Sequence, residues 1–275
     1  MQTATAHGAT IPVIGFGTWN ISGEHCARSV ADAIKIGYRH IDTAAGYRNE
    51  DRVGEGVRAS GVPREQLFIT TKVASENLAE ADFNRSVENS LRQLKVDQVD
   101  LLLIHWPSKV LPVAETIATL NAAKRKGWTK HIGVSNFTIK LLAEAWRATK
   151  EPIVTNQIEY HPYLTQENVV AAIRGHGMLL TAYSPLGRQV ILDDPVIVDL
   201  ARKKGRTPAQ IVLRWDTQQA GVVTIPKSTN EVNIRANFDI FNFELSDAEM
   251  KALSALGARK QRIAGWPPAA PEWDP

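Results

Sequence analysis

Residues 67–105 read LFITTKVASENLAEADFNRSVENSLRQLKVDQVDLLLIH and contain one complete structural unit. Two apolar runs, Leu67–Lys72 and Val99–His105, have the length of buried strands. Between these runs, four apolar residues recur at the spacing of one helix face: Phe83, Val87, Leu91 and Leu94. A strand, a helix and a second strand in this order predict two parallel strands joined by a crossover helix.

The same alternation continues on both sides of this unit. Eight runs in all have the character of strands: Val13–Gly17, Tyr38–Asp42, Leu67–Lys72, Val99–His105, Lys130–Val134, Ile153–Glu159, Met178–Tyr183 and Val222–Ile225. Eight strands that alternate with helical patterns predict an α/β protein with a parallel sheet. We expect a closed (β/α)8 TIM barrel that forms a single domain over residues 1–275. Residues 1–12 precede it, and residues 257–275 form an extended tail that folds over one end.

A doubly wound dinucleotide-binding sheet is the alternative fold for such a pattern, and it usually begins with a glycine fingerprint after the first strand. The segment Gly15–Asn20 lacks the third glycine of that fingerprint. Gly54 and Gly56 match the loose pattern, but they lie inside a polar helical segment and not after a strand. We interpret this match as chance, which leaves the barrel.

Composition excludes several classes of protein. The net charge is +3, and Lys and Arg are scattered without a basic run, which argues against a nucleic-acid partner. No apolar stretch approaches the roughly 18 residues of a membrane span. Met1–His7 has neither the basic start nor the apolar centre of a signal peptide, and Cys26 has no second cysteine to pair with. We therefore expect a cytoplasmic protein, a monomer, with no membrane partner.

Three neighbouring strands end in polar residues that can do chemistry. Asp42 ends the second predicted strand, Lys72 the third, and His105 the fourth, while Tyr47 lies in the loop after Asp42. Each residue alone is more often structural. In a barrel, however, the C-terminal ends of the strands meet at one mouth, where active sites form.

The combination predicts a phenolic general acid. A buried Lys72 needs a counter-ion, which Asp42 can supply. Its ammonium beside Tyr47 favours the phenolate and predicts a pKa below the ordinary value of about 10. Tyr47 could then donate a proton near neutral pH, and His105 adds a donor toward a developing oxyanion.

Seven segments together resemble the aldo-keto reductases, in the order of that family and over nearly the whole chain. They are Gly15–Trp19, Gly37–Tyr47, Thr70–Lys72, Leu103–Pro107, Ile132–Phe137, Asn156–Glu159 and Ile225–Ser228. The short loop after His105 and the ending Ala270–Asp274 are most similar to bacterial 2,5-diketo-gluconate reductases, a type that also reduces methylglyoxal. The resemblance implies a (β/α)8 barrel that reduces aldehydes and ketones, including small dicarbonyls and keto sugars, with NADPH.

The resemblance also implies roles for individual residues. The catalytic residues would be Asp42, Tyr47, Lys72 and His105. The coenzyme would contact Gly17, Thr18, Trp19, Ser135, Asn136, Gln157, Tyr183, Ser184, Leu186, Arg188, Lys227, Ser228, Asn233 and Asn237. Among these, Ser135, Asn136 and Gln157 would bind the carboxamide and Tyr183 would stack on the nicotinamide ring. The substrate would contact Trp19, Trp106 and Trp266, and no metal is expected.

The loops after the seventh and eighth strands often bind phosphate in barrels. Here Ser184–Arg188 and Pro226–Thr229 supply hydroxyls, a glycine and two cations, and the second loop precedes a helix N-terminus. Many family members add an Arg where this chain has Asn233, and Arg235 lies about 200° further round the helix. The family's adenine-contacting Glu is replaced by Ala236. We therefore expect NADPH to be preferred but NADH to be usable.

Other functions fit the sequence less well. None of the seven histidines forms an H-x-H or H-x-x-x-H pair, which argues against a metal-dependent hydrolase. Gly133–Phe137 lacks the closing glycine of a serine hydrolase nucleophile turn. The remaining alternative is a coenzyme-binding sensor or regulatory subunit that keeps the barrel but turns over weakly.

Overall fold

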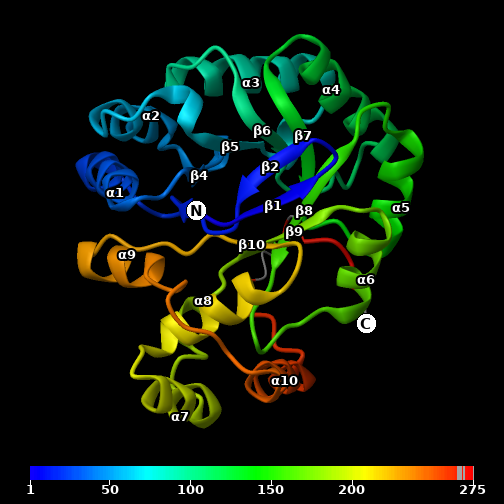
Figure 1. The fold of residues 1–275 in the computed structure, drawn as a ribbon. Helices are drawn as coiled ribbons and strands as arrows, with labels where there is room; N and C mark the ends of the chain where they lie inside the picture. Colours follow the sequence, from blue (N-terminus) through cyan, green and yellow to red (C-terminus); the bar gives the residue numbers. More distant parts are fainter. Residues whose placement is uncertain (265–267, 269, 275) are drawn as a thin grey trace.

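The computed structural model describes residues 1–264, 268 and 270–274. Within them, eight parallel strands form one sheet in sequential order, and Figure 1 shows the ring of helices around it. The strands are β3 (Phe16–Gly17), β4 (His40–Asp42), β5 (Phe68–Val73), β6 (Val99–Ile104), β7 (Thr129–Ser135), β8 (Ile153–Glu159), β9 (Leu179–Tyr183) and β10 (Val222–Thr224). Each lies within two or three residues of a predicted strand, so the predicted barrel is confirmed.

The barrel closes between the first and last of these strands. The Gly15 N–H donates to the Thr224 carbonyl at 2.8 Å, and the Thr224 N–H donates to the Val13 carbonyl at 2.8 Å. A Cβ added to Gly17 would lie 2.8 Å from the Ile225 carbonyl oxygen, so only glycine permits this close approach. β3 itself is confined to two residues, shorter than the predicted Val13–Gly17, although Ile14 still forms a bridge to Thr224.

Helices follow the strands in the described residues, as the alternation predicted. They are α1 (Gly23–Ile36), α2 (Glu50–Ala59), α3 (Glu80–Leu94), α4 (Val113–Arg125), α5 (Ile139–Ala148), α6 (Glu167–Gly175), α8 (Pro208–Gln218) and α9 (Glu231–Phe238), with α7 (Pro195–Lys204) and α10 (Asp247–Ala255) in addition. Gly54 lies inside α2, where a Cβ would meet the Leu94 carbonyl at 2.4 Å. Gly54 therefore allows close packing of α2 and is not part of a dinucleotide fingerprint.

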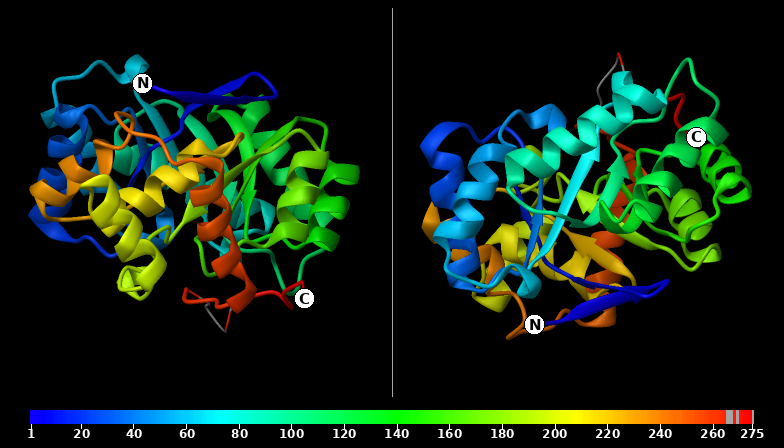
Figure 2. Two further views of the ribbon diagram at one scale, coloured as in Figure 1. Left: turned by 60° about the horizontal axis from the view of Figure 1, so that its bottom comes forward. Right: turned by 90° about the horizontal axis from the view of Figure 1, so that it is seen from above.

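The two ends of the barrel are covered by different parts of the chain, as Figure 2 shows. Residues 1–12, unassigned in the sequence, form an antiparallel hairpin of β1 (Thr3–Ala6) and β2 (Ala9–Pro12). Its apolar residues pack into the N-terminal end of the barrel with Phe68, Leu101 and Val223. The predicted extended tail begins later than expected, because Leu256–Arg259 form a short 3-10 helix.

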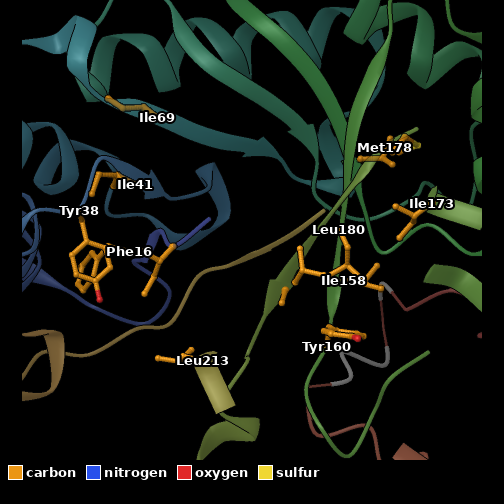
Figure 3. Close-up of a cluster of buried hydrophobic side chains, with 14 of the residues drawn as sticks. Phe16, Tyr38, Ile41, Ile69, Ile158, Tyr160, Ile173, Met178, Leu180 and Leu213 are labelled. Carbon is orange, nitrogen blue, oxygen red and sulfur yellow. The ribbon is translucent and has the colours of Figure 1, made fainter. Parts of the chain in front are cut away.

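The largest apolar cluster lies between the sheet and the helices, and Figure 3 shows part of it, including Ile41, Ile69 and Ile173. These side chains are almost completely buried. No helix in the described part of the chain is both long and apolar enough to cross a membrane. The space between the sheet and the helices is filled, and the N-terminal hairpin covers one end of the barrel. The C-terminal ends of the strands therefore remain as the place for a functional site.

Candidate active site

A cavity of about 930 Å³ lies at the C-terminal ends of the strands. It is lined by every predicted coenzyme residue: Gly17, Thr18, Trp19, Ser135, Asn136, Gln157, Tyr183, Ser184, Leu186, Arg188, Lys227, Ser228, Asn233 and Asn237. Asp42, Tyr47, His105 and Trp106 line it as well. Lys72 lies behind this wall, and Trp266 is outside the described residues.

A buried ion pair forms the floor of the cavity. Lys72 Nζ, at the end of β5, lies 2.5 Å from Asp42 Oδ1, at the end of β4, and both side chains are almost fully buried. The ammonium also donates to the Thr43 carbonyl at 2.8 Å and to Tyr47 Oη at 3.4 Å. The second carboxylate oxygen of Asp42 accepts from Gln157 Nε2 at 2.8 Å. Both charges of the pair are therefore hydrogen-bonded, and the pair meets the cavity at Asp42 and, through the Lys72 contact, at Tyr47.

The pKa values within this group differ in part from the expectation. Burial alone would lower the pKa of Lys72, but Asp42 and Tyr47 beside it raise the pKa above its usual value. Burial also raises the pKa of Tyr47, and the nearby Lys72 ammonium offsets only part of that rise. The predicted net lowering of the Tyr47 pKa is therefore wrong, because the sequence shows the ammonium but not the desolvation.

His105 lies beside Tyr47 in the lining of the cavity. The two rings are 5.5 Å apart and nearly perpendicular. Burial, together with the Lys72 charge, lowers the pKa of His105 to about 3. The imidazole is therefore neutral near pH 7 and offers one N–H donor next to the phenol.

A second wall carries amide and hydroxyl groups from β7, β8 and β9. Ser135 Oγ donates to the Gln157 carbonyl at 2.8 Å, and Asn136 Nδ2 donates to the His105 carbonyl at 3.0 Å. Tyr183 Oη donates to Asn136 Oδ1 at 2.8 Å. Asn136 has a left-handed backbone, with φ of 63°, which turns its amide away from the strand. These bonds fix a polar shelf beside the Tyr47–His105 pair.

The far arm of the cavity is cationic. Lys227 and Ser228 lie in the loop after β10. This loop leads to Asn230, whose side chain caps α9 by accepting from the Val232 and Asn233 N–H groups. Arg188, in the loop after β9, stacks over the Trp19 ring at 4.8 Å. Arg235 is exposed and pairs with Glu231 at 3.1 Å. Its position on the helix predicted that it points away from the phosphate-binding loop, and it does not replace the Arg that many family members have at position 233.

A nicotinamide adenine dinucleotide phosphate needs partners for a carboxamide, a flat ring and phosphates. One cavity is lined by the amide shelf, by the phenol ring of Tyr183 and by the cationic arm. Amides suit a carboxamide, and Lys227, Ser228 and the start of α9 suit phosphate. The residues present therefore fit this coenzyme.

Some cavity residues were missed in the sequence. Thr207, Pro208 and Ala209 line it because the N-terminus of α8 points toward the cationic arm. The only signal for them was the Thr-Pro helix start, where Thr207 and Gln210 form a capping box. Gln189 and Leu192 also line the cavity, and their loop carries no sequence pattern that would have revealed this. Ala264 lines it too, from the C-terminal tail that was expected to fold over this end of the barrel.

Aromatic side chains form the outer wall. Trp106 lines the cavity and contacts Trp273 edge-on, with 6.1 Å between ring centroids. Asp274 Oδ2 accepts from the Ile139 N–H at 3.0 Å, at the start of α5. The C-terminal segment therefore returns to the mouth of the barrel, where the tail was expected.

Known proteins match this chain along its length. The model of the aldo/keto reductase family matches residues 13–258. The chain is 42% identical over 267 residues to methylglyoxal reductase DkgB of Escherichia coli O157:H7, covering 96% of this chain and 99% of that protein. A crystal structure described as a 2,5-diketo-D-gluconic acid reductase B has a TM-score of 0.97 at 43% identity, covering 100% and 98% of the two chains. The Bombyx mori aldo-keto reductase in complex with NADP has a TM-score of 0.90 at 33% identity, covering 96% of this chain and 95% of that one.

Proposed function

The chain belongs to the aldo/keto reductase family of oxidoreductases, and we propose that it reduces aldehydes and ketones with NADPH, using Tyr47 as the general acid. The family match confirms the resemblance drawn from the sequence motifs. The observation that carries the proposal is the contact of Lys72 Nζ with Tyr47 Oη at 3.4 Å, backed by Asp42 at 2.5 Å, at the floor of the cavity.

NADPH is the coenzyme of this family, and one solved relative holds NADP. Ser135, Asn136 and Gln157 would hold its carboxamide, Tyr183 its ring, and Lys227 with Ser228 its phosphate. When bound, the reduced nicotinamide supplies a hydride to the carbonyl carbon.

Three side chains of this protein provide and control the proton that the carbonyl oxygen receives. Because burial raises the pKa of Tyr47, its phenol is protonated near pH 7 and can give its proton to the carbonyl oxygen. The Lys72 ammonium then stabilises the phenolate that remains. The neutral His105 donates a hydrogen bond from its ring N–H to the same oxygen and so places the carbonyl beside the phenol.

The substrates that we propose are small dicarbonyls, with keto sugars and other aldehydes as further candidates. Support comes from the relatives named for methylglyoxal and 2,5-diketo-D-gluconic acid. Trp19 and Trp106 provide apolar walls beside the polar floor, a lining that suits a compact carbonyl compound.

The test is Tyr47→Phe, with Tyr38→Phe as the matched control. Tyr38 is buried, donates to the Ile234 carbonyl at 3.1 Å and does not line the cavity. Tyr47→Phe should lower kcat by about 10²-fold or more and leave NADPH binding intact, as measured by fluorescence titration. The control should keep its kcat. A Tyr47→Phe protein that retains most of its kcat would contradict the assignment, and a wild type that binds NADPH without oxidising it would favour the sensor.

A further inference from the structure

Glu159 ends β8 and carries a fully buried carboxylate that the proposed chemistry does not use. It lies two residues after Gln157, so both side chains leave the strand on the same face. Gln157 reaches inward to Asp42 at 2.8 Å, whereas Glu159 lies at the rim. There it meets a segment more than 100 residues later in the sequence.

The carboxylate accepts an unusually complete set of hydrogen bonds. Glu159 Oε1 accepts from the backbone N–H of Ile263 at 2.6 Å and of Ala264 at 2.8 Å. His161 Nε2 lies 3.1 Å from the same oxygen, and Arg262 Nη1 lies 3.4 Å from Oε2. Burial alone would raise the pKa of Glu159, but His161 and the backbone N–H groups of Ile263 and Ala264 hold that pKa below its ordinary value. The group is therefore an anion whose ligand is the chain's own C-terminal segment.

This segment forms part of the cavity wall. Ala264 lines the cavity directly. Arg262 extends from Glu159 to stack over the Trp273 ring at 3.6 Å, and it also donates to Gln166 Oε1 at 3.1 Å. Trp273 in turn contacts Trp106, which lines the cavity. A continuous series of contacts therefore joins the carboxylate to the substrate side of the site.

We propose that Glu159 is a positioning residue that fixes the C-terminal segment against the cavity and so determines how tightly larger carbonyl substrates bind. The proposal rests on the proposed function for its substrate. Other contacts hold the segment away from the cavity wall: Arg259 with Asp194 at 2.7 Å, the Gln261 N–H with the Tyr163 carbonyl at 2.9 Å, and Asp274 with the Ile139 N–H. Among the described residues, Glu159 binds the backbone of Ile263 and of Ala264, which lines the cavity.

The first experiment needs no enzyme activity. Amide hydrogen exchange of Ile263 and Ala264 is measured in wild type, in Glu159→Gln and in Glu50→Gln. Glu50 is an equally buried carboxyl, bound by Thr71 and Ser90 and remote from the segment. Glu159→Gln should speed exchange roughly tenfold to hundredfold, because charge-assisted bonds become neutral. The control should not. Unchanged exchange in Glu159→Gln overturns the proposal.

The second experiment separates positioning from general damage. In Glu159→Gln, KM for an aromatic aldehyde should rise about tenfold, whereas kcat for methylglyoxal and the Kd for NADPH should stay near wild type. Arg262→Met, which keeps the two backbone contacts, should shift the same KM in the same direction. An equal loss for both substrates, or weakened NADPH binding, would show a merely structural role. If wild type reduces no carbonyl, the proposed function fails, and the exchange data still decide whether Glu159 holds the segment.

Discussion

Lys72→Met removes the cation from the floor of the cavity. The wild-type ammonium is fully buried and donates to Asp42, to the Thr43 carbonyl and to Tyr47. Methionine has a similar length but no donor, so Asp42 retains Gln157 Nε2 as its side-chain partner. The change therefore leaves a buried carboxylate without a compensating charge.

Breaking a buried ion pair by removing one partner costs about 3–5 kcal/mol in folding stability. For a chain of this size each kcal/mol corresponds to roughly 2–4 °C in Tm. We expect Tm to fall by about 10 °C. We also expect kcat to fall by about 10²-fold or more, because the phenolate of Tyr47 loses its stabilising charge.

The assay pairs thermal denaturation with steady-state kinetics on three proteins: wild type, Lys72→Met, and Lys72→Met combined with Asp42→Asn. The double variant has no stranded charge, so it should regain most of the lost stability while remaining inactive. A single variant that melts within about 2 °C of wild type would refute the view that this pair compensates its own burial. A single variant with wild-type kcat would refute the role of Lys72 in catalysis.

Three further outcomes follow from the structure, two of them from the site. Lys227→Ala should nearly abolish the preference for NADPH over NADH. The wild-type preference should itself be one to two orders of magnitude weaker than that of a protein with both Lys and Arg at this place. The reason is that Asn233 supplies no charge, which removes one charge-assisted contact of about 1.5–3 kcal/mol. The ratio of kcat/KM for the two coenzymes measures both, and a wild type that prefers NADH would contradict the assignment. Deletion of residues 261–275 should raise KM or lower kcat for bulky carbonyls more than it weakens NADPH binding; equal kinetics with full-length protein would count against this. Burial lowers the pKa of His40 to about 4, so between about pH 6.5 and 4 the unfolded chain binds a proton that the folded chain excludes, and stability falls as pH falls. His40→Asn should reduce this loss in urea denaturation at pH 7 and pH 5, and an identical loss in both proteins would exclude His40 as its source.

The positions of the catalytic side chains could be predicted because they depend on one regular feature. Asp42 ends β4, Lys72 is the last residue but one of β5, and His105 directly follows β6. Parallel strands bring such ends together whatever the detail of the helices. The exposed direction of Arg235 was likewise fixed by helix geometry, and its pairing with Glu231 agrees with it.

Other features depend on burial and on long-range packing, which the sequence does not display. The net pKa shift of Tyr47 could not be predicted, because the neighbouring ammonium is visible in the sequence but the degree of desolvation is not. Glu159 stood inside a recognised motif without a role, because its partners Ile263 and Ala264 come from the far end of the chain. The N-terminal hairpin was missed because its His7-Gly8 turn gives only a weak signal.

The short seam between β3 and β10 bears on how fast the protein is degraded in a cell. β3 has two residues and β10 three, against six in β5 and β6, so only a short stretch of backbone joins the ring there. Trp19 and Lys227 lie just beyond the two sides of this seam, and both line the cavity. A ligand that touches both therefore adds a link across this short seam and shields the chain from proteases that attack opened forms. The abundance of the protein should then rise and fall with the supply of that ligand, without any change in its synthesis.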